Sequence, residues 1–391
     1  MNILYILSDT TMFGGGTKSF LTLFEGLCNK GIEPTIVLPD NNGLYKYLTQ
    51  KGFKTLILPI RFSTYPRTRN ITEILLFPLR LLYWQYCNFI SVKRLVRLLQ
   101  DDRPDIIHTN VSVVDVGLRV AQKLGVSHIY HFREYADKDF GLKYFPSPAS
   151  FYNMVKLGKS YSICITKDNQ RHHRLQDNPY SKVIYDGVLP ASNIEKDFVL
   201  GDYFLYVGRI EPTKGLMELL IAYKSYSESV SNTFVLKVAG EVVDENYYKE
   251  ITRYITQHKL SAYVVFVGQR DDVLDLYREA RAVIVPSRFE GFGRCMPEAM
   301  FQGTIVIGHD TGGTKEQFDN GVEYTSQEIG LRYDSINELL NHLIFMHNAT
   351  EQDVSDMRLR AYDTVNKLYS IENNVEAVES FYKDIINDEH N

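Results

Sequence analysis

This sequence has few cysteines, and its cysteines and histidines are not spaced like the ligands of a metal ion. The 391 residues include four cysteines that stand far apart, so neither a disulfide framework nor a zinc site is indicated. An excess of positive charge is also lacking. The formal net charge is −5, which argues against a general nucleic-acid-binding protein. We therefore expect a protein of a reducing compartment with no nucleic-acid partner and no bound metal.

Targeting signals are absent from the start of the chain as well. The N-terminal apolar run Ile3–Leu7 is short and has neither a basic lead nor a small-residue cleavage site, so it indicates a first buried strand and not a signal peptide. Hydrophobic residues make up 44% and charged residues 23%, as in globular proteins. We expect a cytoplasmic protein that is long enough for two domains, each with its own core.

Short apolar runs alternate with longer amphipathic stretches, and the alternation occurs twice. This β-α order predicts two α/β domains, each with a doubly wound parallel sheet. We place the first domain at 1–187, a linker with Pro190 and little periodicity at 188–202, and the second domain at 203–368. The predicted strands are Ile3–Leu7, Thr35–Leu38, Thr55–Leu58, Ile106–Thr109, Ser127–His131 and Ser162–Ile165 in the first domain, then Tyr203–Val207, Thr233–Ala239, Val264–Val267, Ala282–Val285 and Thr304–Ile307 in the second.

Two carboxylates, Glu290 and Glu298, bracket a glycine-rich segment that contains Gly291, Phe292 and Gly293. A proline directly precedes the second glutamate, and proline is favoured in the first turn of a helix. The first glutamate is therefore expected in a loop and the second early in a helix, with free backbone N–H groups between them. This arrangement suits a ligand with hydroxyls at both ends and an anion in the middle, such as a nucleotide sugar. Two solvated carboxylates beside a helix start are the structural alternative.

A second charged element, Gly208–Gly215, follows the first strand of the second domain. It contains two cations, Arg209 and Lys214, and fixed cations of this kind suit an anionic ligand. The alternative is a surface pair beside Glu211, which would contribute almost nothing to stability.

These two elements resemble the motifs of a known enzyme family. The Glu290/Glu298 spacing is similar to the E-x7-E motif of retaining nucleotide-sugar glycosyltransferases with the GT-B fold, and residues 283–313 are most similar to family 4. The resemblance implies two Rossmann-like domains facing a cleft and a last helix, within 369–391, that crosses back to the first domain. It also implies that Glu290 holds the transferred sugar, Glu298 the ribose, and Arg209 and Lys214 the diphosphate.

The loop after the first strand, from Phe13 to Ser19, allows three interpretations. A Walker A loop fails because Met12 and Thr17 stand at its glycine positions. A dinucleotide fingerprint fits Gly14 and Gly16, with Asp40 near the expected ribose-binding position, but Ser19 replaces the third glycine. The third interpretation resembles the Gly-Gly loop of the glycosyltransferases, in which Gly15 and Gly16 open a helix beside the donor; an ordinary strand-to-helix turn is the structural alternative.

Other strand ends carry further candidates. His131 ends the fifth strand, where open α/β sheets bind ligands, and it aligns with a family histidine at the edge of the active site. Arg133 and Glu134 resemble a variant in polysaccharide-assembly members, in which such residues face the acceptor. Gln269 and Arg270 follow a strand of the second domain, at a turn that meets the nucleotide base in the family. For His131 the structural alternative is a buried residue whose hydrogen bonds are satisfied within the protein, which is the more frequent role of a lone histidine.

The stretch from Arg61 to Leu99 is basic and rich in aromatic and aliphatic residues. Pro78, Arg80, Gln85 and Asn88 make it a poor transmembrane span. A basic amphipathic helix can lie in a membrane interface, and it can equally bury one face on its own domain. Both interpretations remain open. The basic residues are Arg61, Arg67, Arg69, Arg80, Lys93, Arg94 and Arg97.

The resemblance implies a retaining glycosyltransferase that moves a hexose-type sugar from a nucleoside-diphosphate sugar, with uridine the commonest base, to an acceptor hydroxyl. A lipid-linked glycan in surface polysaccharide synthesis is the expected acceptor, reached from the inner face of the cytoplasmic membrane. No cofactor is expected, and we interpret the D-x-D spacing of Asp137 and Asp139 as coincidence. Two alternatives remain: a nucleotide-cofactor oxidoreductase that uses Gly14–Ser19, and a non-catalytic GT-B-like binding subunit. The sequence leaves the oligomeric state undetermined.

Overall fold

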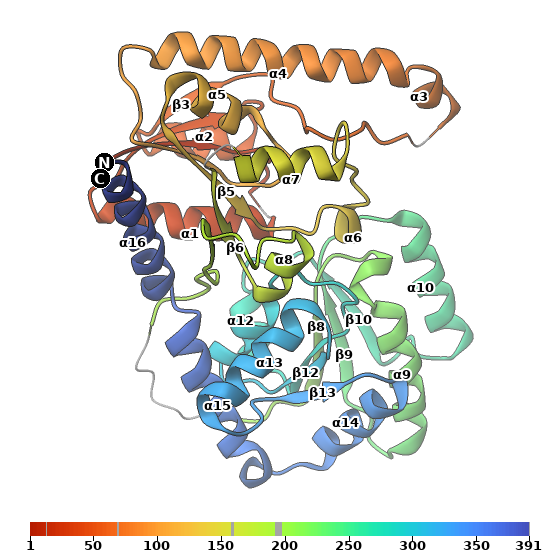
Figure 1. Ribbon diagram of the computed structural model, residues 1–391. Coiled ribbons are helices and arrows are strands. Elements are labelled where there is room, and N and C mark those ends of the chain that lie inside the picture. The colour runs from red at the N-terminus through yellow and green to blue at the C-terminus, as the bar shows by residue number, and fades with distance from the viewer. Residues whose placement is uncertain (13, 69, 158–159, 192–197, 391) are drawn as a thin grey trace. The chain divides into compact units, whose positions relative to one another are not determined.

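The chain divides into two compact units, which we describe separately. The computed structural model describes residues 1–12, 14–68, 70–157, 160–191 and 198–390. The first unit comprises Met1–Gly187 together with Ile371–Asn391, and the second comprises Val188–Ser370 (Figure 1). Three predictions fall partly outside the described residues: Phe13 in the glycine-rich loop, Arg69 in the basic stretch and 192–197 in the linker.

The first unit is built on a sheet of seven strands in the order β3-β2-β1-β4-β5-β6-β7. Every strand pairing in it is parallel. Parallel strands that are covered on both faces are apolar almost throughout, which is why the sequence shows them as short hydrophobic runs. The strands are β1 (Asn2–Ile6), β2 (Glu33–Leu38), β3 (Lys54–Ile57), β4 (Ile106–Thr109), β5 (Ser127–Phe132), β6 (Ser160–Cys164) and β7 (Ser181–Val183).

The helices of the first unit connect these strands, and one comes from the far end of the chain. They are α1 (Gly15–Asn29), α2 (Gly43–Gln50), α3 (Ile71–Leu75), α4 (Phe77–Leu99), α5 (Val116–Leu124), α6 (Asp137–Phe140), α7 (Pro148–Leu157), α8 (Lys167–His172) and α16 (Ile371–His390).

The second unit repeats the design with six parallel strands in the order β10-β9-β8-β11-β12-β13. Its strands are β8 (Tyr203–Val207), β9 (Val235–Ala239), β10 (Val264–Gly268), β11 (Ala282–Val285), β12 (Val306–His309) and β13 (Leu331–Tyr333). Its helices are the 3-10 turn η1 (Pro212–Lys214), α9 (Leu216–Ser229), α10 (Glu245–Gln257), α11 (Val273–Arg278), α12 (Cys295–Phe301), α13 (Gly312–Thr325), α14 (Ile336–Asn348) and α15 (Glu351–Leu368).

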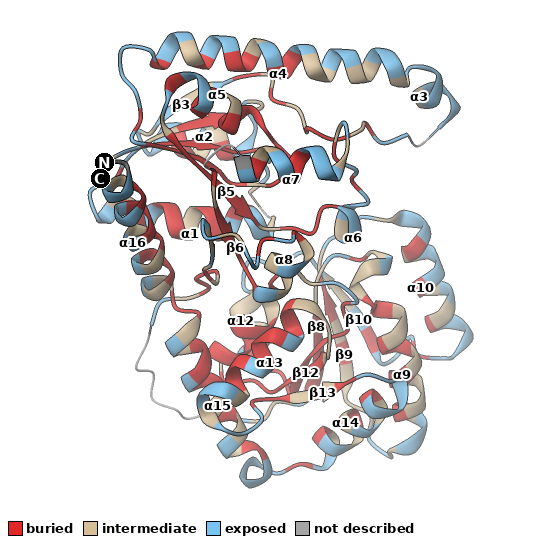
Figure 2. Ribbon diagram, viewed as in Figure 1, coloured by how far each residue is buried: buried red, intermediate tan, exposed pale blue. Residues whose placement is uncertain are grey.

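The prediction of two doubly wound parallel sheets is confirmed, but several details were wrong. The short strands β7 and β13 were missed. Some strands have other bounds than we expected. The strand expected at Ser162–Ile165 is β6, which begins at Ser160, and the strand expected at Thr304–Ile307 is β12, which continues to His309. Serine, glycine and histidine at these strand ends hide them from a search for apolar runs. Each sheet is buried between its helices, as the red strands in Figure 2 show.

Helix α16 completes the core of the first unit. Its apolar face packs into the cluster formed by β1, β2 and α1, and α1 approaches it so closely that a Cβ at Gly26 would lie 2.3 Å from Val375. The buried residues of α16 recur at helical spacing, so the periodicity in the sequence has its origin in this packing. They are Val375, Val378, Phe381, Tyr382 and Ile385.

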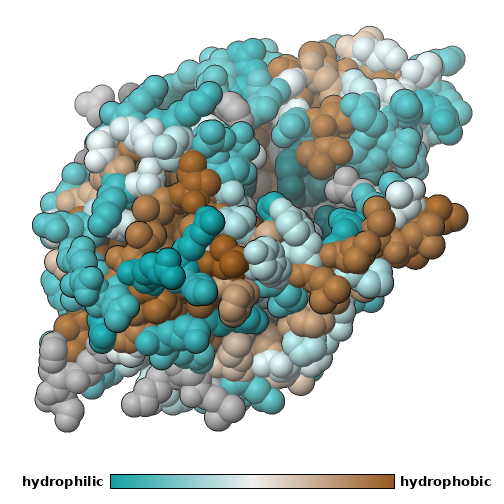
Figure 3. Space-filling view, turned by 90° about the horizontal axis from the view of Figure 1, so that it is seen from above, coloured by the Kyte–Doolittle hydropathy of each residue, from teal (hydrophilic) through white to brown (hydrophobic). Residues whose placement is uncertain are grey.

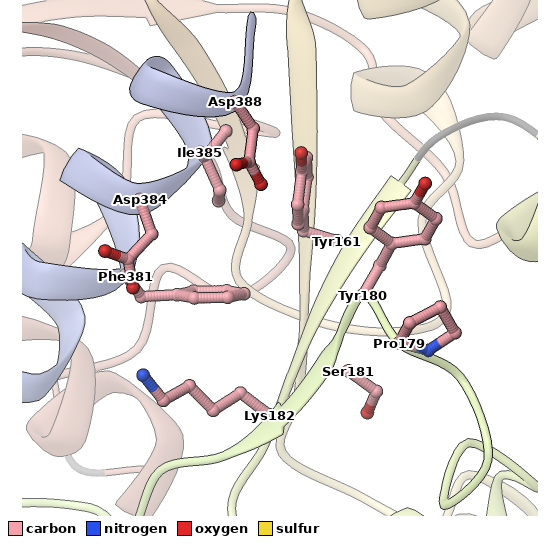
Figure 4. A pocket seen from close by; sticks show the side chains of 9 residues that line it. All are labelled: Tyr161, Pro179, Tyr180, Ser181, Lys182, Phe381, Asp384, Ile385 and Asp388. Atoms are coloured by element: carbon pink, nitrogen blue, oxygen red, sulfur yellow. The ribbon is translucent and has the colours of Figure 1, made fainter. Parts of the chain in front are cut away.

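A pocket of about 270 Å³ lies between α16 and strands β6 and β7 of the first unit. Figure 4 shows Phe381, Asp384 and Asp388 on the helix, with Tyr161 and Lys182 on the strands. None of its lining residues is a predicted site residue, so this pocket is not the site that the sequence indicates.

Candidate functional site

The strand order of the second unit defines where its ligand site should lie. Strand order reverses between β8 and β11, and open α/β sheets bind ligands beside the carboxyl ends of the strands at such a switch point. The segment Gly208–Gly215 follows β8, and the loop with Glu290 follows β11. The two charged elements found in the sequence therefore emerge from the two strands that flank the switch point.

Lys214 and Glu290, which lie 76 positions apart in the sequence, form an ion pair at this point. The Lys214 Nζ donates to Glu290 Oε1 over 2.7 Å, and the two side chains are only 17% and 12% exposed. Burial disfavours the charged ammonium, but the charge and hydrogen bond of Glu290 outweigh burial and raise the pKa of Lys214. The amine therefore stays charged and is held in a fixed position.

The backbone conformation of Gly215 positions this lysine. Its φ is +70°, and a Cβ at this position would lie 1.9 Å from the carbonyl oxygen of Pro286, just after β11. Only glycine combines this conformation with such a close approach. The loop after β8 can therefore turn against the loop after β11, which brings Lys214 to Glu290.

Arg209 lies at the same strand end and is more exposed. Its guanidinium pairs with Glu211 over 2.8 Å, and 43% of its side chain is accessible to solvent. This is the exposed ion pair that the sequence offered as the structural alternative, and it contributes little to stability. Arg209 is thus a cation at the edge of the site, whereas Lys214 lies inside it.

Glu298 lies in the first turn of α12, as the preceding proline indicated. It accepts hydrogen bonds from Arg294 Nε over 3.3 Å and from the Tyr277 hydroxyl over 3.2 Å. Burial, then the nearby Glu298 carboxylate, raises the pKa of Tyr277, so its hydroxyl remains a donor. Sequence reasoning missed Arg294 and Tyr277 as site residues, although the four-residue spacing between Arg294 and Glu298 is typical of a helical ion pair.

The glycine-rich segment between the two glutamates is held by α13. The Gly313 N–H donates to the Glu290 carbonyl over 2.8 Å, and the Gln317 side-chain amide donates to the Phe292 carbonyl. A Cβ at Gly313 would lie 2.6 Å from the carbonyl oxygen of Phe292. The Gly-Gly turn at the start of α13 therefore holds this loop, and Gly291, Phe292 and Gly293 are fixed in place between the carboxylates.

Gln269 and Arg270 are not brought to this cluster. They follow β10, which is the edge strand and lies two strands away from β8, so about 10 Å separates the strand ends. Arg270 is exposed and makes a two-bond ion pair with Asp272. A role in contacting a nucleotide base therefore stays a prediction.

In the first unit the switch point lies between β1 and β4. Gly15 and Gly16 are the first residues of α1, the next helix or strand after β1 in the chain, and no atom lies within 4 Å of a Cβ built at Gly16. Asp40, the acid of the dinucleotide interpretation, accepts hydrogen bonds from the Thr10 hydroxyl and the Asn42 N–H. Its carboxylate thus organises the loop after β2.

His131 and its neighbours form a buried network at the carboxyl end of β5. Arg133 makes a 2.6 Å ion pair with Asp186 and donates to Asn110, while the Glu134 carboxylate accepts from both the N–H and the hydroxyl of Ser112. Burial raises the pKa of Glu134 to about 7. Arg133 and Glu134 are engaged inside the first unit, and an acceptor-binding role for them stays a prediction.

The D-x-D spacing of Asp137 and Asp139 falls in the short helix α6. Asp139 accepts from the Tyr135 N–H, and Asp137 pairs with His172. Among the described residues, no group of three or more histidine, cysteine or acidic side chains is arranged to hold a metal ion. The expectation that no metal is required remains a prediction.

Two doubly wound parallel sheets, one with cations and carboxylates at its switch point, define an α/β protein with the layout in which such sheets bind ligands. Comparison with models of protein families identifies the family within this class. The model described as "Glycosyltransferase Family 4" matches residues 13–187, and the model described as "Glycosyl transferases group 1" matches residues 195–353. The chain belongs to the family 4 glycosyltransferases with the GT-B fold.

Curated relatives agree with this assignment. An uncharacterized glycosyltransferase of Methanocaldococcus jannaschii is 29% identical over 227 residues, which are 56% of this chain and 60% of that protein. A glycogen synthase of Acholeplasma laidlawii is 25% identical over 50% of this chain and 43% of its own. Both matches span less than two thirds of the relative. An uncharacterized 42.6 kDa protein in the cps region of Klebsiella pneumoniae is 23% identical over 98% of this chain and 100% of its own.

Solved structures share the fold over nearly the whole chain. A glycosyltransferase from Rickettsia africae has a TM-score of 0.77 at 16% identity and covers 98% of both chains. Anabaena HepE in complex with UDP has a TM-score of 0.76 at 18% identity and covers 98% of this chain and 100% of its own. At such identities the likeness concerns the fold alone.

Proposed function

We propose that the protein is a retaining glycosyltransferase that moves a hexose-type sugar from a nucleoside-diphosphate sugar to an acceptor hydroxyl. The observation that carries the proposal is the partly buried Lys214–Glu290 pair at the switch point of the second unit, together with Glu298, which Arg294 holds. A fixed cation paired with one carboxylate, together with a second oriented carboxylate, suits a ligand that carries a diphosphate and two hydroxylated sugars.

In this mechanism each residue acts through charge or position. Lys214 and Arg209 neutralise the diphosphate, and their effect grows as the leaving nucleoside diphosphate gains charge. Glu290 accepts hydrogen bonds from hydroxyls of the transferred sugar, and Glu298 accepts them from the ribose. No protein nucleophile is invoked: the acceptor hydroxyl attacks on the face that the diphosphate leaves, and a phosphate oxygen takes its proton. The configuration at the anomeric carbon is then retained, and no metal ion is needed.

Uridine diphosphate is the nucleotide we propose. Anabaena HepE, which shares the fold, forms a complex with UDP. Calorimetric titration of a panel of nucleoside diphosphates in EDTA tests this choice. We expect one diphosphate to bind without metal, and Glu298→Ala to weaken it roughly 10- to 100-fold, the value of a hydrogen bond to a charged group. Glu323→Ala, which removes an exposed carboxylate from the same unit, serves as the control.

The same titration, together with a sugar-transfer assay, separates the alternative functions. Binding of dinucleotides only, with no effect of Glu298→Ala, would favour the oxidoreductase interpretation based on Gly14–Ser19. Nucleotide binding without transfer to any acceptor would favour the non-catalytic subunit. Where transfer occurs, the anomeric proton coupling of the product, measured by NMR, decides between retention and inversion.

A lipid-linked glycan in surface polysaccharide synthesis is the acceptor that we propose. The support is the relative from the Klebsiella pneumoniae cps region, whose match covers 98% of this chain and 100% of that protein. The test supplies radiolabelled donor to a membrane-extracted acceptor pool and, in parallel, to soluble glycans. Labelling of the soluble glycans alone would contradict this choice.

We further propose that helices α3 and α4 bind the inner face of an anionic membrane, where such an acceptor would be located. One face of α4 packs on α5 and is buried at Cys87, Val92 and Leu95, among others. The opposite face is exposed, and hydrophobic patches lie among hydrophilic ones on the side that carries α3 and α4 (Figure 3). This exposed stripe comprises Leu79, Leu82, Tyr83, Tyr86 and Phe89, continued by Lys93, Arg94 and Arg97.

Exposed apolar residues that continue into basic ones along one helix face match an anionic lipid interface. Among the described residues, no helix is both long enough and apolar enough to cross a bilayer. The contact would therefore lie in the interface plane, with α3 adding its exposed Ile71, Ile74 and Leu75.

Co-sedimentation with vesicles tests the membrane contact. We expect binding to vesicles that contain phosphatidylglycerol and little binding to pure phosphatidylcholine. The double variant with Lys93→Gln and Arg97→Gln should weaken vesicle binding roughly 30-fold at low salt, because each lost charge costs about 1 kcal/mol of binding free energy. The matched control is Lys249→Gln with Lys259→Gln in the second unit. Equal loss in both pairs, or binding that ignores lipid charge, would contradict the proposal.

A further inference from the structure

A line of buried hydrogen bonds joins helix α16 to His131 across the sheet of the first unit. The hydroxyls of Tyr5 and Tyr382 lie 3.1 Å apart, and the Tyr382 hydroxyl lies 2.6 Å from Nδ1 of His108. His108 Nε2 in turn lies 3.2 Å from His131 Nδ1. Residues from β1, α16, β4 and β5 therefore form one continuous chain that none of the steps proposed above uses.

Arg133 fixes the direction of this chain. One of its terminal N–H groups lies 3.3 Å from His131 Nδ1, and a guanidinium can only donate. His131 Nδ1 is therefore the acceptor and carries no proton. Since His108 Nε2 reaches the same nitrogen, His108 must donate from Nε2 and accept at Nδ1. The Tyr382 hydroxyl must then donate to His108, and the Tyr5 hydroxyl must donate to Tyr382.

The proton of neutral His131 consequently lies on Nε2. That nitrogen is fully buried and has no hydrogen-bond partner among the described residues. An unpartnered buried donor is costly, by roughly 1–3 kcal/mol, and a functional role is one of the reasons for which proteins keep such a group. Burial, and then the charge of Arg133, lowers the pKa values of His108 and His131 well below 6.5, so both rings are neutral at pH 7.

We propose that Arg133 directly, and Tyr382 through His108, together hold His131 in the tautomer with its proton on Nε2, so that His131 serves the bound ligand as a neutral hydrogen-bond donor and not as a base. The ligand atom it fits is an oxygen acceptor, such as a sugar hydroxyl or a phosphate oxygen. Tyr382 and His108 are then positioning residues. The identity of the ligand rests on the proposed function, but the tautomer does not.

The experiment reads the tautomer directly, in the full-length protein and without any ligand. Histidine labelled with ¹⁵N is incorporated, and two-bond ¹H–¹⁵N correlation spectra at pH 7 show which ring nitrogen carries the proton. His108→Gln and His131→Gln assign the two signals. We expect both rings to be neutral and protonated on Nε2.

Two hydroxyl deletions then separate positioning from packing. Tyr382→Phe removes the donor to His108, so the His108 and His131 signals should shift towards a mixture of tautomers, and kcat for sugar transfer should fall about tenfold with little change in KM. Tyr5→Phe removes an equally buried hydroxyl but leaves the Tyr382–His108 bond, so it should leave both tautomers unchanged.

A wild-type His131 that is protonated on Nδ1, or on both nitrogens, would overturn the proposal. So would an unchanged spectrum in Tyr382→Phe. If Tyr382→Phe fails to fold, the wild-type spectrum still decides. If the tautomers behave as expected but no transfer is found, the proposed function fails and the positioning role stands.

Discussion

At the residue scale, the Lys214–Glu290 ion pair places a negative charge beside the proposed diphosphate site. We expect Glu290→Gln to leave UDP affinity unchanged or to raise it by up to roughly tenfold, because a like charge beside the anion is removed. Sugar transfer should nevertheless fall at least about a hundredfold, because the transferred sugar loses its orientation. Calorimetry and a radiometric transfer assay measure the two effects. Glu279→Gln, which removes an exposed carboxylate of the same unit, is the control. If Glu290→Gln lowered UDP binding and sugar transfer to the same extent, the prediction would be wrong.

Glu134 makes a pH-dependent contribution to stability at the same scale. Its folded pKa of about 7 lies above the ordinary 4.5, so the native state holds its proton longer than the unfolded state does. Stability should therefore fall as pH rises from about 4.5 through about 7, by roughly 3 kcal/mol once the carboxyl is ionised. Glu134→Gln should remove this loss, seen by calorimetric unfolding at pH 5 and pH 8. Glu33→Gln, which is exposed, should reproduce the wild-type difference.

At the element scale, the turns after the strands of the second unit depend on glycine for different reasons. Gly215 and Gly268 have nearly the same φ, +70° and +69°, but only Gly215 lies against another backbone. Gly268→Ala should therefore cost only the conformational strain, about 1 kcal/mol, which lowers Tm by about 2–4 °C. Gly215→Ala should cost several times more and also weaken UDP binding, because Lys214 moves. Thermal unfolding compares the two, and equal shifts would show that the close approach to Pro286 is unimportant.

The sequence predicted most elements but few of their contacts. Strands such as β4, β8 and β11 were located with the right bounds, because an apolar run buried on both faces is a local signal. Glu290 and Lys214 were both selected, yet nothing in one sequence shows that residues 76 positions apart form an ion pair. The Tyr382–His108 bond spans 274 positions and was missed for the same reason.

Helix α4 shows the same limit for surfaces. Its composition was consistent both with a buried connecting helix and with an interfacial one, and both remained open. The structure locates the buried face at Cys87, Val92 and Leu95 and leaves the opposite face exposed. Helical spacing alone separates these two faces, but packing on α5 decides which of them is covered.

At the scale of the whole molecule, the two units differ in how the chain builds them. The second unit is one continuous segment, Val188–Ser370, and it contains Arg209, Lys214, Glu290 and Glu298. We expect this segment to fold when expressed alone and to bind UDP within about tenfold of the full-length affinity, since domains with their own core can fold independently. Circular dichroism and calorimetry test this. Folding without any nucleotide binding would mean that the first unit supplies essential donor contacts.

The first unit, in contrast, should not be stable as Met1–Gly187. Without α16, the core residues that Val378, Phe381 and Tyr382 cover would be exposed to water. We expect this fragment to lack a cooperative thermal transition and to gain one when a peptide of residues 371–391 is added. A cooperative transition in the fragment alone would contradict the role given to α16.

The return of the chain to its first unit has a consequence for biosynthesis. All of Val188–Ser370 is translated before α16 exists, which at about 5–20 residues per second takes on the order of ten seconds or more. Throughout that interval the nascent first unit lacks its last helix, so the ribosome-bound chain exposes the apolar surface that α16 later covers. Because Tyr382 belongs to this same late helix, its hydrogen bond to His108 can form only after the ribosome has nearly finished the chain.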